Sequence, residues 1–240
     1  MAVPDTAQER REVLTEVYRE ARACERCPHL AQTRTQVVFG AGNADADLMF
    51  VGEAPGADED RDGVPFVGRA GKLLTELLGG IGIAREDVFI ANVLKCRPPE
   101  NRNPTASEIA NCSEWLFRQL ELIQPVVVVT LGNFATKLLR DDQTSITKIH
   151  GQAEIRVIGR RAVRLFPVLH PAAALYTPSN REVLAADVAL IPGLVALGPP
   201  PQPGADEPEP QTLPEPEPEP VAAAPGADAA AVDDSQLGLF

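Results

Sequence analysis

Residues 52–71 read GEAPGADEDRDGVPFVGRAG and directly follow the apolar run LMFV at residues 48–51. The apolar run is typical of a buried strand, and the glycines, prolines and carboxylates after it are typical of a loop. In open α/β sheets, the loops at the carboxyl ends of the strands hold the ligands. Glycines let backbone approach a ligand closely, and carboxylates can hold a water molecule. The segment therefore predicts a site at a sheet edge, with a solvated surface turn as the alternative.

Apolar runs alternate with helical patterns along the rest of the chain. Strands are expected at 47–52, 87–93, 125–131 and 163–169, and helices at 5–23, 70–79, 105–123, 132–140 and 180–191. Two short runs within 153–168, on either side of Gly159 and Arg160, predict a hairpin at one edge of the sheet. Continuous apolar strands separated by helices favour a parallel sheet that is covered on both faces. We expect an α/β/α sandwich of three layers with a central, mainly parallel sheet.

Composition bounds the class of protein. The chain has 240 residues, of which 44% are hydrophobic, enough for one substantial core. We find no run long enough to span a membrane and no signal segment, so we expect a cytoplasmic, nucleoid-associated protein. The net charge of −12 argues against nucleic acid as a partner. However, nine of the 34 acidic residues lie in 199–240, which has no Lys or Arg, so the body is nearly neutral and can present a basic face.

The acidic C-terminal segment differs from the body in kind as well as in charge. It contains PEPEPEP and an alanine-rich run, and such a sequence cannot bury enough apolar surface to offset the entropy of ordering. We therefore expect one folded domain over residues 1–197 and a disordered acidic tail over residues 198–240.

The four cysteines are Cys24, Cys27, Cys96 and Cys112. In a chain with no secretory signal, four thiols are better explained as metal ligands than as disulfides. Structural zinc favours two tight CxxC pairs, and only one pair is tight here. The spacing thus favours an iron–sulfur cluster over zinc and leaves both open, with four ordinary buried thiols as a third interpretation.

Three motifs together resemble one known family. GEAPG at 52–56, DGVPFVGRAG at 62–71 and HPAAAL at 170–175 are similar to the family 4 uracil-DNA glycosylases, the iron–sulfur branch of that superfamily. The resemblance covers roughly residues 20–195. It implies the α/β/α fold, hydrolytic release of uracil from DNA with an abasic site left behind, and a 4Fe–4S cluster on the four cysteines. The alternatives are a glycosylase for other deaminated bases and a non-catalytic iron–sulfur module that binds DNA.

The resemblance also assigns the chemistry. His170 ends a predicted strand and precedes Pro171, so it lies at a strand–helix junction where donors can meet a developing anion. In the family this histidine bonds uracil O2 and stabilises the leaving anion. Glu53 is the candidate that positions or activates the attacking water.

Base recognition falls to a second group of residues. Asn92 ends a predicted strand, and its side-chain amide can pair with both O4 and N3–H of uracil. Phe66 can stack on an extruded base, with ordinary core packing as the alternative. The resemblance places Glu59 near the base, and we expect backbone at Gly52 and Ala54 to line the pocket.

Contacts with DNA are expected from basic residues around the predicted site. The loop that starts at Lys95 reads KCRPPENRNPTASE and contains no histidine, whereas a related branch bonds DNA covalently through a histidine there. We therefore expect an enzyme that turns over. The candidate contacts are Arg69, Lys95, Arg97 and Arg102 for phosphates and Leu175, beside Tyr176, as a wedge.

The last five residues, QLGLF at 236–240, form an apolar cluster at the end of the polar tail. They resemble the peptides that bind the bacterial sliding clamp, and Gln236, Leu237, Leu239 and Phe240 carry the resemblance. We expect a monomer that docks on the clamp through this peptide.

Overall fold

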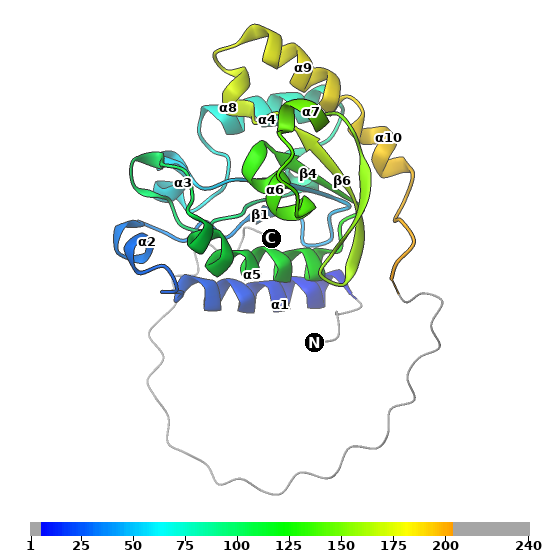
Figure 1. Ribbon diagram of the computed structural model, residues 1–240. Helices are drawn as coiled ribbons and strands as arrows, with labels where there is room; N and C mark the ends of the chain where they lie inside the picture. Colours follow the sequence, from blue (N-terminus) through cyan, green and yellow to red (C-terminus); the bar gives the residue numbers. More distant parts are fainter. Residues whose placement is uncertain (1–5, 204–240) are drawn as a thin grey trace, which may run out of the picture.

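The computed structural model describes residues 6–203, in which six strands form one sheet (Figure 1). The order across the sheet is β1-β3-β2-β4-β6-β5, and the four inner strands are parallel. Strands β1 and β5 are antiparallel to their neighbours at the two edges. The strands are β1 (Ala41–Gly42), β2 (Leu48–Gly52), β3 (Phe89–Asn92), β4 (Val127–Leu131), β5 (Glu154–Ile158) and β6 (Arg161–Val168). The four predicted inner strands and the hairpin are confirmed, and the two-residue β1 was not predicted.

Helices lie on both faces of the sheet. The longer ones are α1 (Ala7–Arg22), α4 (Arg69–Gly80), α5 (Ala106–Ile123), α6 (Asn133–Arg140) and α9 (Pro178–Val188). The shorter ones are α2 (Pro28–Thr33), α3 (Ala57–Asp62), α7 (Ile146–Ile149), α8 (Pro171–Ala174) and α10 (Ile191–Ala196), with 3-10 turns at Arg85–Asp87 and Pro99–Asn101. The single helix predicted at 180–191 is wrong, because α9 ends at Val188 and Pro192 stands in the first turn of α10, where its ring could not continue a helix from α9.

Two separate cores show the layers. Strand β2 sends Met49 and Val51 into the core beneath α1 and α5, and Leu48 and Phe50 into the opposite core beneath α4 and α9. Figure 1 shows α1 and α5 side by side on one side of the sheet, with α4, α8 and α9 on the other. The predicted three-layer α/β/α sandwich is therefore confirmed.

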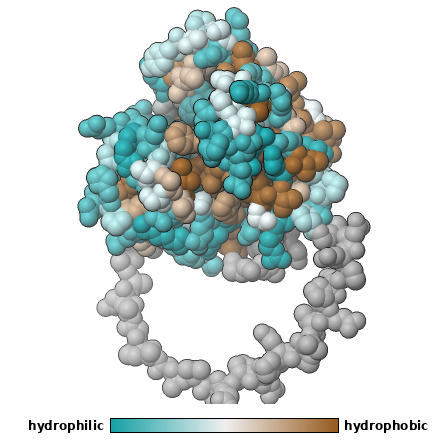
Figure 2. Space-filling model, in the orientation of Figure 1, coloured by the Kyte–Doolittle hydropathy of each residue, from teal (hydrophilic) through white to brown (hydrophobic). Residues whose placement is uncertain are grey.

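The surface and the helices add two observations. Ile155 and Val157 of β5 are exposed, and Figure 2 shows hydrophobic residues along the side of the molecule where the β5–β6 hairpin runs. Among the described residues, the helices are all too short or too polar to span a bilayer.

Parallel pairing brings the functional segments to one edge. The register aligns Gly52 at the end of β2 with Asn92 at the end of β3. Strand β6 ends at Val168, two residues before His170, and runs parallel to β4, which in turn pairs with β2. Three stretches far apart in the sequence thus reach the same end of the sheet.

Candidate active site

A cavity of about 350 Å³ opens at this end of the sheet. Its walls come from the loop after β2, the loop before α4, the end of β3, the segment 98–102 and the start of α8. Glu53, Ala54, Glu59, Phe66, Asn92 and His170 all line it, together with Pro55, Gly56, Ala70, Pro98, Asn101, Arg102 and Ala172. Six of the seven residues predicted to bind substrate or to take part in catalysis therefore face one space.

Asn92 is almost completely buried, with 1% of its surface exposed. Its side-chain Oδ1 has no hydrogen-bond partner among the described residues. A buried polar atom without a partner is costly, so such an atom in a cavity wall points to a ligand that supplies the missing donor.

Gly52, the seventh predicted residue, lies behind the cavity wall instead of in it. A Cβ atom at this position would lie against Asn92 Oδ1 and 2.6 Å from Cζ of Phe66. The absence of a side chain at Gly52 is what allows the amide and the phenyl ring to sit over the strand end.

Phe66 adopts a backbone conformation that is unusual for an aromatic residue, with φ of 53°. A Cβ atom at Gly71, in the first turn of α4, would collide with the carbonyl oxygen of Phe66, so the glycine permits this turn. The ring centroids of Phe66 and His170 are 5.8 Å apart with an angle of 33° between the planes. The chain thus holds the phenyl ring beside the imidazole.

His170 is the N-cap residue of α8, and its Nδ1 accepts a hydrogen bond from the backbone N–H of Ala172 at 3.1 Å. Because Nδ1 accepts, the ring proton of the neutral imidazole is on Nε2. Burial lowers the pKa of His170 to about 4, although the charge of Glu59 acts in the opposite direction. At neutral pH the residue is therefore an uncharged donor.

Glu53 follows the last residue of β2 and is partly buried. Burial alone raises the pKa of its carboxyl group. Glu53 and His170 also line a second cavity of about 430 Å³, which extends towards α6, α7 and α9. A carboxylate between two cavities can reach both a bound base and solvent.

Glu59 has a structural task that the sequence did not indicate. One carboxylate oxygen accepts the N–H groups of Val67 and Gly68 at 3.0 and 2.9 Å, and the other accepts the N–H of Gly56 at 3.1 Å. Glu59 thus joins the loop after β2 to the loop before α4, and its predicted place near the base stays a prediction.

The candidates for DNA contact lie in different environments. Lys95 is 1% exposed and its Nζ is bonded inside the protein, so the prediction that it contacts DNA is wrong. Leu175 is partly buried and packs on the core beneath α4 and α9, whereas Tyr176 is 74% exposed. Arg69 is exposed and donates to the Tyr176 hydroxyl at 3.0 Å.

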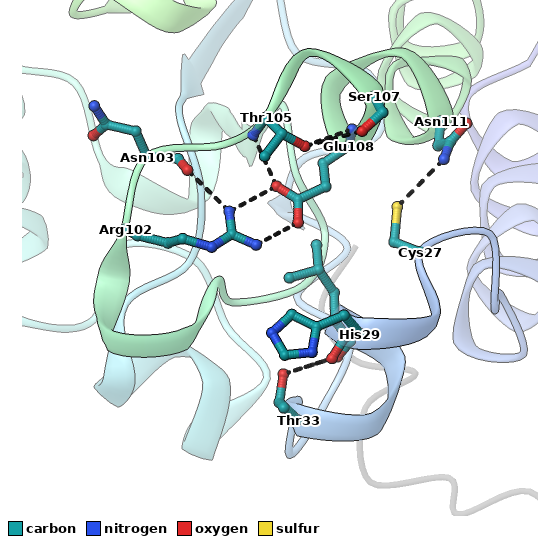
Figure 3. Close-up of polar contacts among 10 residues, drawn as sticks. Cys27, His29, Thr33, Arg102, Asn103, Thr105, Ser107, Glu108 and Asn111 are labelled. Atoms are coloured by element: carbon teal, nitrogen blue, oxygen red, sulfur yellow. Dashed lines mark hydrogen bonds and ion pairs between the residues drawn. The ribbon is translucent and has the colours of Figure 1, made fainter.

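The segment between the two pockets was not predicted to line the cavity at Pro98 or Asn101. Asn101 has φ of 54° and accepts a hydrogen bond from Arg97 Nε at 2.7 Å. Arg102 forms two hydrogen bonds with the carboxylate of Glu108 on α5, at 2.6 and 2.9 Å (Figure 3). Only an Asn–Pro-rich composition marked this loop in the sequence, and composition does not fix which side chain faces a cavity.

A second pocket is lined by all four cysteines, Cys24, Cys27, Cys96 and Cys112. N–H groups point at three of the sulfur atoms: Arg34 Nη1 to Cys96 at 3.3 Å, the Lys95 backbone to Cys112 at 3.2 Å, and Asn111 Nδ2 to Cys27 at 3.8 Å (Figure 3 draws the last). Within residues 6–203, no group of three or more His, Cys, Asp or Glu side chains is arranged to hold one metal ion. The cysteines surround a space instead of converging on a point.

Comparisons with known proteins agree with this geometry. The profile of the uracil DNA glycosylase superfamily matches residues 39–189, so the chain belongs to that superfamily. Within it the chain belongs with the type-4 uracil-DNA glycosylases. The relative from Archaeoglobus fulgidus is 48% identical over 73% of this chain and 90% of its own length. Those from Thermotoga maritima and Sulfurisphaera tokodaii are 47% and 46% identical, over 74% and 72% of this chain and 93% and 81% of their own lengths.

Proposed function

We propose that this protein is a uracil-DNA glycosylase that acts in DNA repair, takes an extruded uracil into the cavity and hydrolyses its N-glycosidic bond. Membership of the superfamily supports the activity. One structural observation carries the assignment of the site: the unpaired, buried Oδ1 of Asn92 lies in the same cavity as Glu53 and the neutral His170. A group that lacks a donor, a neutral donor and a carboxylate are what uracil, its leaving anion and a water require.

The side-chain amide of Asn92 reads the base. Uracil presents a donor at N3 and an acceptor at O4, which match the amide oxygen and the amide N–H groups. Cytosine presents an acceptor at N3 and a donor at N4, and it would leave Oδ1 facing a lone pair. Phe66 stacks on the base and holds it in the plane of the amide.

Bond cleavage leaves an electron pair on the base. As the bond between N1 and C1′ breaks, the pair moves into the uracil ring and negative charge builds on O2, while the sugar gains oxocarbenium character. The Nε2–H of His170 donates to O2, and the cost of this charge falls because the donor is already in place. Water then bonds to C1′, and Glu53 orients it and accepts its proton.

The test is an excision assay with purified protein on single- and double-stranded oligonucleotides that contain one uracil. We expect free uracil and an alkali-labile abasic site, with no strand cleavage before alkali. Parallel substrates with hypoxanthine or xanthine distinguish a broader deaminated-base glycosylase. If DNA binds but no base is released, the protein is a binding module and the proposal fails.

We propose further that Cys24, Cys27, Cys96 and Cys112 hold a 4Fe–4S cluster. Four sulfur atoms around one space, three of which accept N–H groups, fit the ligand set of such a cluster, in which hydrogen bonds to sulfur are common. The cluster would join the segment before α2 to the loop before α5. Iron and acid-labile sulfide in equal amounts, with broad visible absorption, are expected; bound zinc without iron would contradict the assignment.

The remaining parts of the chain have proposed tasks of their own. Residues 1–197 form the glycosylase domain, which acts as a monomer, and residues 198–240 form the acidic tail. Arg69, Arg97 and Arg102 are the surface candidates for phosphate contact, and the exposed Tyr176 beside Arg69 replaces Leu175 as the candidate wedge.

The peptide at 236–240 lies outside the described residues, and the proposal that it binds the sliding clamp rests on sequence alone. Deletion of residues 236–240 is expected to abolish clamp binding in a pull-down and to leave excision on short oligonucleotides unchanged. Undiminished clamp binding would refute the proposal.

A further inference from the structure

Lys95 is a fully buried lysine midway between the two pockets. Its Nζ donates to the backbone carbonyl of Asn92 at 2.9 Å and to Oε1 of Gln119 at 2.6 Å, and it lies 5.6 Å from the centre of the Phe39 ring. Gln119 is itself buried, and its Nε2 donates to the carbonyl of Phe39 at 2.9 Å. The lysine side chain is thus held in one position by partners from three segments.

Neutral partners alone do not explain a buried ammonium group. Its two acceptors are amide oxygens, and removing an ammonium from water is costly unless an opposite charge lies nearby. The cysteine pocket supplies that charge: the backbone N–H of Lys95 donates to Cys112 Sγ, Cys96 is the next residue, and both thiolates act electrostatically on the lysine. A metal centre with four thiolates and a net negative charge would balance the ammonium.

We propose that Lys95 is a positioning residue that couples the metal centre to the base-reading amide. Its charge balances the cysteine-bound centre, and the same ammonium fixes the carbonyl of Asn92 and with it the residue whose Oδ1 meets the base. The inference rests on the proposed function and on the proposed cluster. It gives the metal centre a role in setting the pocket as well as in joining two loops.

The geometry gives this coupling two separable effects. Loss of the ammonium leaves a buried carbonyl of Asn92 short of one donor, which loosens the amide and slows excision. It also removes a positive charge beside the cluster, which disfavours the reduced, more negative state and lowers the reduction potential. A lysine that only fills space would change neither in this combination.

The main test is Lys95→Met, which keeps the length of the side chain and the backbone N–H to Cys112 but removes the charge and the donor. We expect the variant to retain its iron, to excise uracil at least tenfold more slowly in single turnover, with a smaller change in DNA binding, and to have a more negative cluster potential. Lys137→Met on α6 is the matched control, and neither quantity should change.

Gln119→Met is the second variant, because it keeps the ammonium and removes one of its two acceptors. We expect a smaller loss of excision rate and an almost unchanged potential, and this variant carries the test if Lys95→Met does not fold. An unchanged excision rate in both variants would overturn the positioning role, and an unchanged potential in Lys95→Met would overturn the charge coupling. Absence of excision in the unsubstituted protein would instead contradict the proposed function, while the potential could still be measured.

Discussion

The base pocket and the cysteine pocket lie within a few residues of each other, yet they are incomplete in opposite ways. In the base pocket, burial leaves Asn92 Oδ1 without a partner and keeps His170 neutral. In the cysteine pocket, hydrogen-bond donors already point at the sulfur atoms, and burial raises the pKa of Cys112 to about 12. The first pocket lacks hydrogen-bond partners, and the second lacks positive charge.

This difference explains what each pocket can bind. A neutral base that enters and leaves can supply a donor to an unpaired amide, and its departure restores only a modest cost. Buried thiols lose their protons only when a strong positive charge stays beside them, which is the task of a permanently bound metal centre. One pocket is therefore suited to turnover and the other to a resident group.

The largest expected effect is on the cysteine pocket. Cys112→Ala removes one of four ligands from a site that ties α5 to the loop before it, so we expect loss of visible absorption and of bound iron, and a folded fraction that falls sharply on purification. Absorption spectra and iron analysis measure this. Asn111→Ala, which removes only a donor to Cys27, should keep the iron; equal loss in both variants would mean that the pocket responds to packing alone.

A large but more selective effect is expected at Glu53. Because burial raises the pKa of Glu53 and the reaction needs its carboxylate, kcat/KM should fall as the pH drops through that raised pKa. Glu53→Gln should lower single-turnover excision by roughly 10²–10⁴-fold and remove this acid limb.

His170→Gln serves as the comparison, since the pKa of His170 is about 4 and its imidazole stays neutral above that pH. It should slow excision by roughly 10²–10³-fold and keep the acid limb. An acid limb that survives in Glu53→Gln would show that another group handles the water.

A smaller effect should separate the pocket from the scaffold that supports it. Gly52→Ala places a methyl group against Asn92 Oδ1 and Phe66, so we expect slower excision and a loss of about 1–3 kcal/mol in the free energy of unfolding. Gly79→Ala in α4 meets no atom within 4 Å and should gain about 0.5–1 kcal/mol. Denaturant unfolding measures both, and equal stability of the two variants would contradict the close packing behind Asn92.

Much of this could be predicted from the sequence. Continuous apolar strands followed by glycine-rich or HPAAAL-type junctions gave the inner strands, because a buried parallel strand leaves a strong pattern. The side chains at strand ends, Asn92 and His170, and those of the loop after β2 followed, because parallel strands bring their carboxyl ends to one edge.

The errors concern residues whose role depends on what surrounds them. Lys95 has the sequence context of a surface lysine, and only the fold shows that α5 brings Gln119 to it. Glu59 could not be recognised as a link between two loops, because its three backbone partners depend on how both loops turn. The break between α9 and α10 follows from Pro192, a local signal that periodicity overrode.

The most direct test of the account is the ratio of single-turnover excision rates on uracil and on cytosine in otherwise identical DNA, for the unsubstituted protein and for Asn92→Asp. A carboxylate offers only acceptors, so it repels the O4 edge of uracil and accepts from N4–H of cytosine. The account predicts a strong preference for uracil in the unsubstituted protein and a collapse of that preference in the variant, with uracil excision much slower. If the ratio is the same in both proteins, the amide of Asn92 does not read the base and the central claim is wrong.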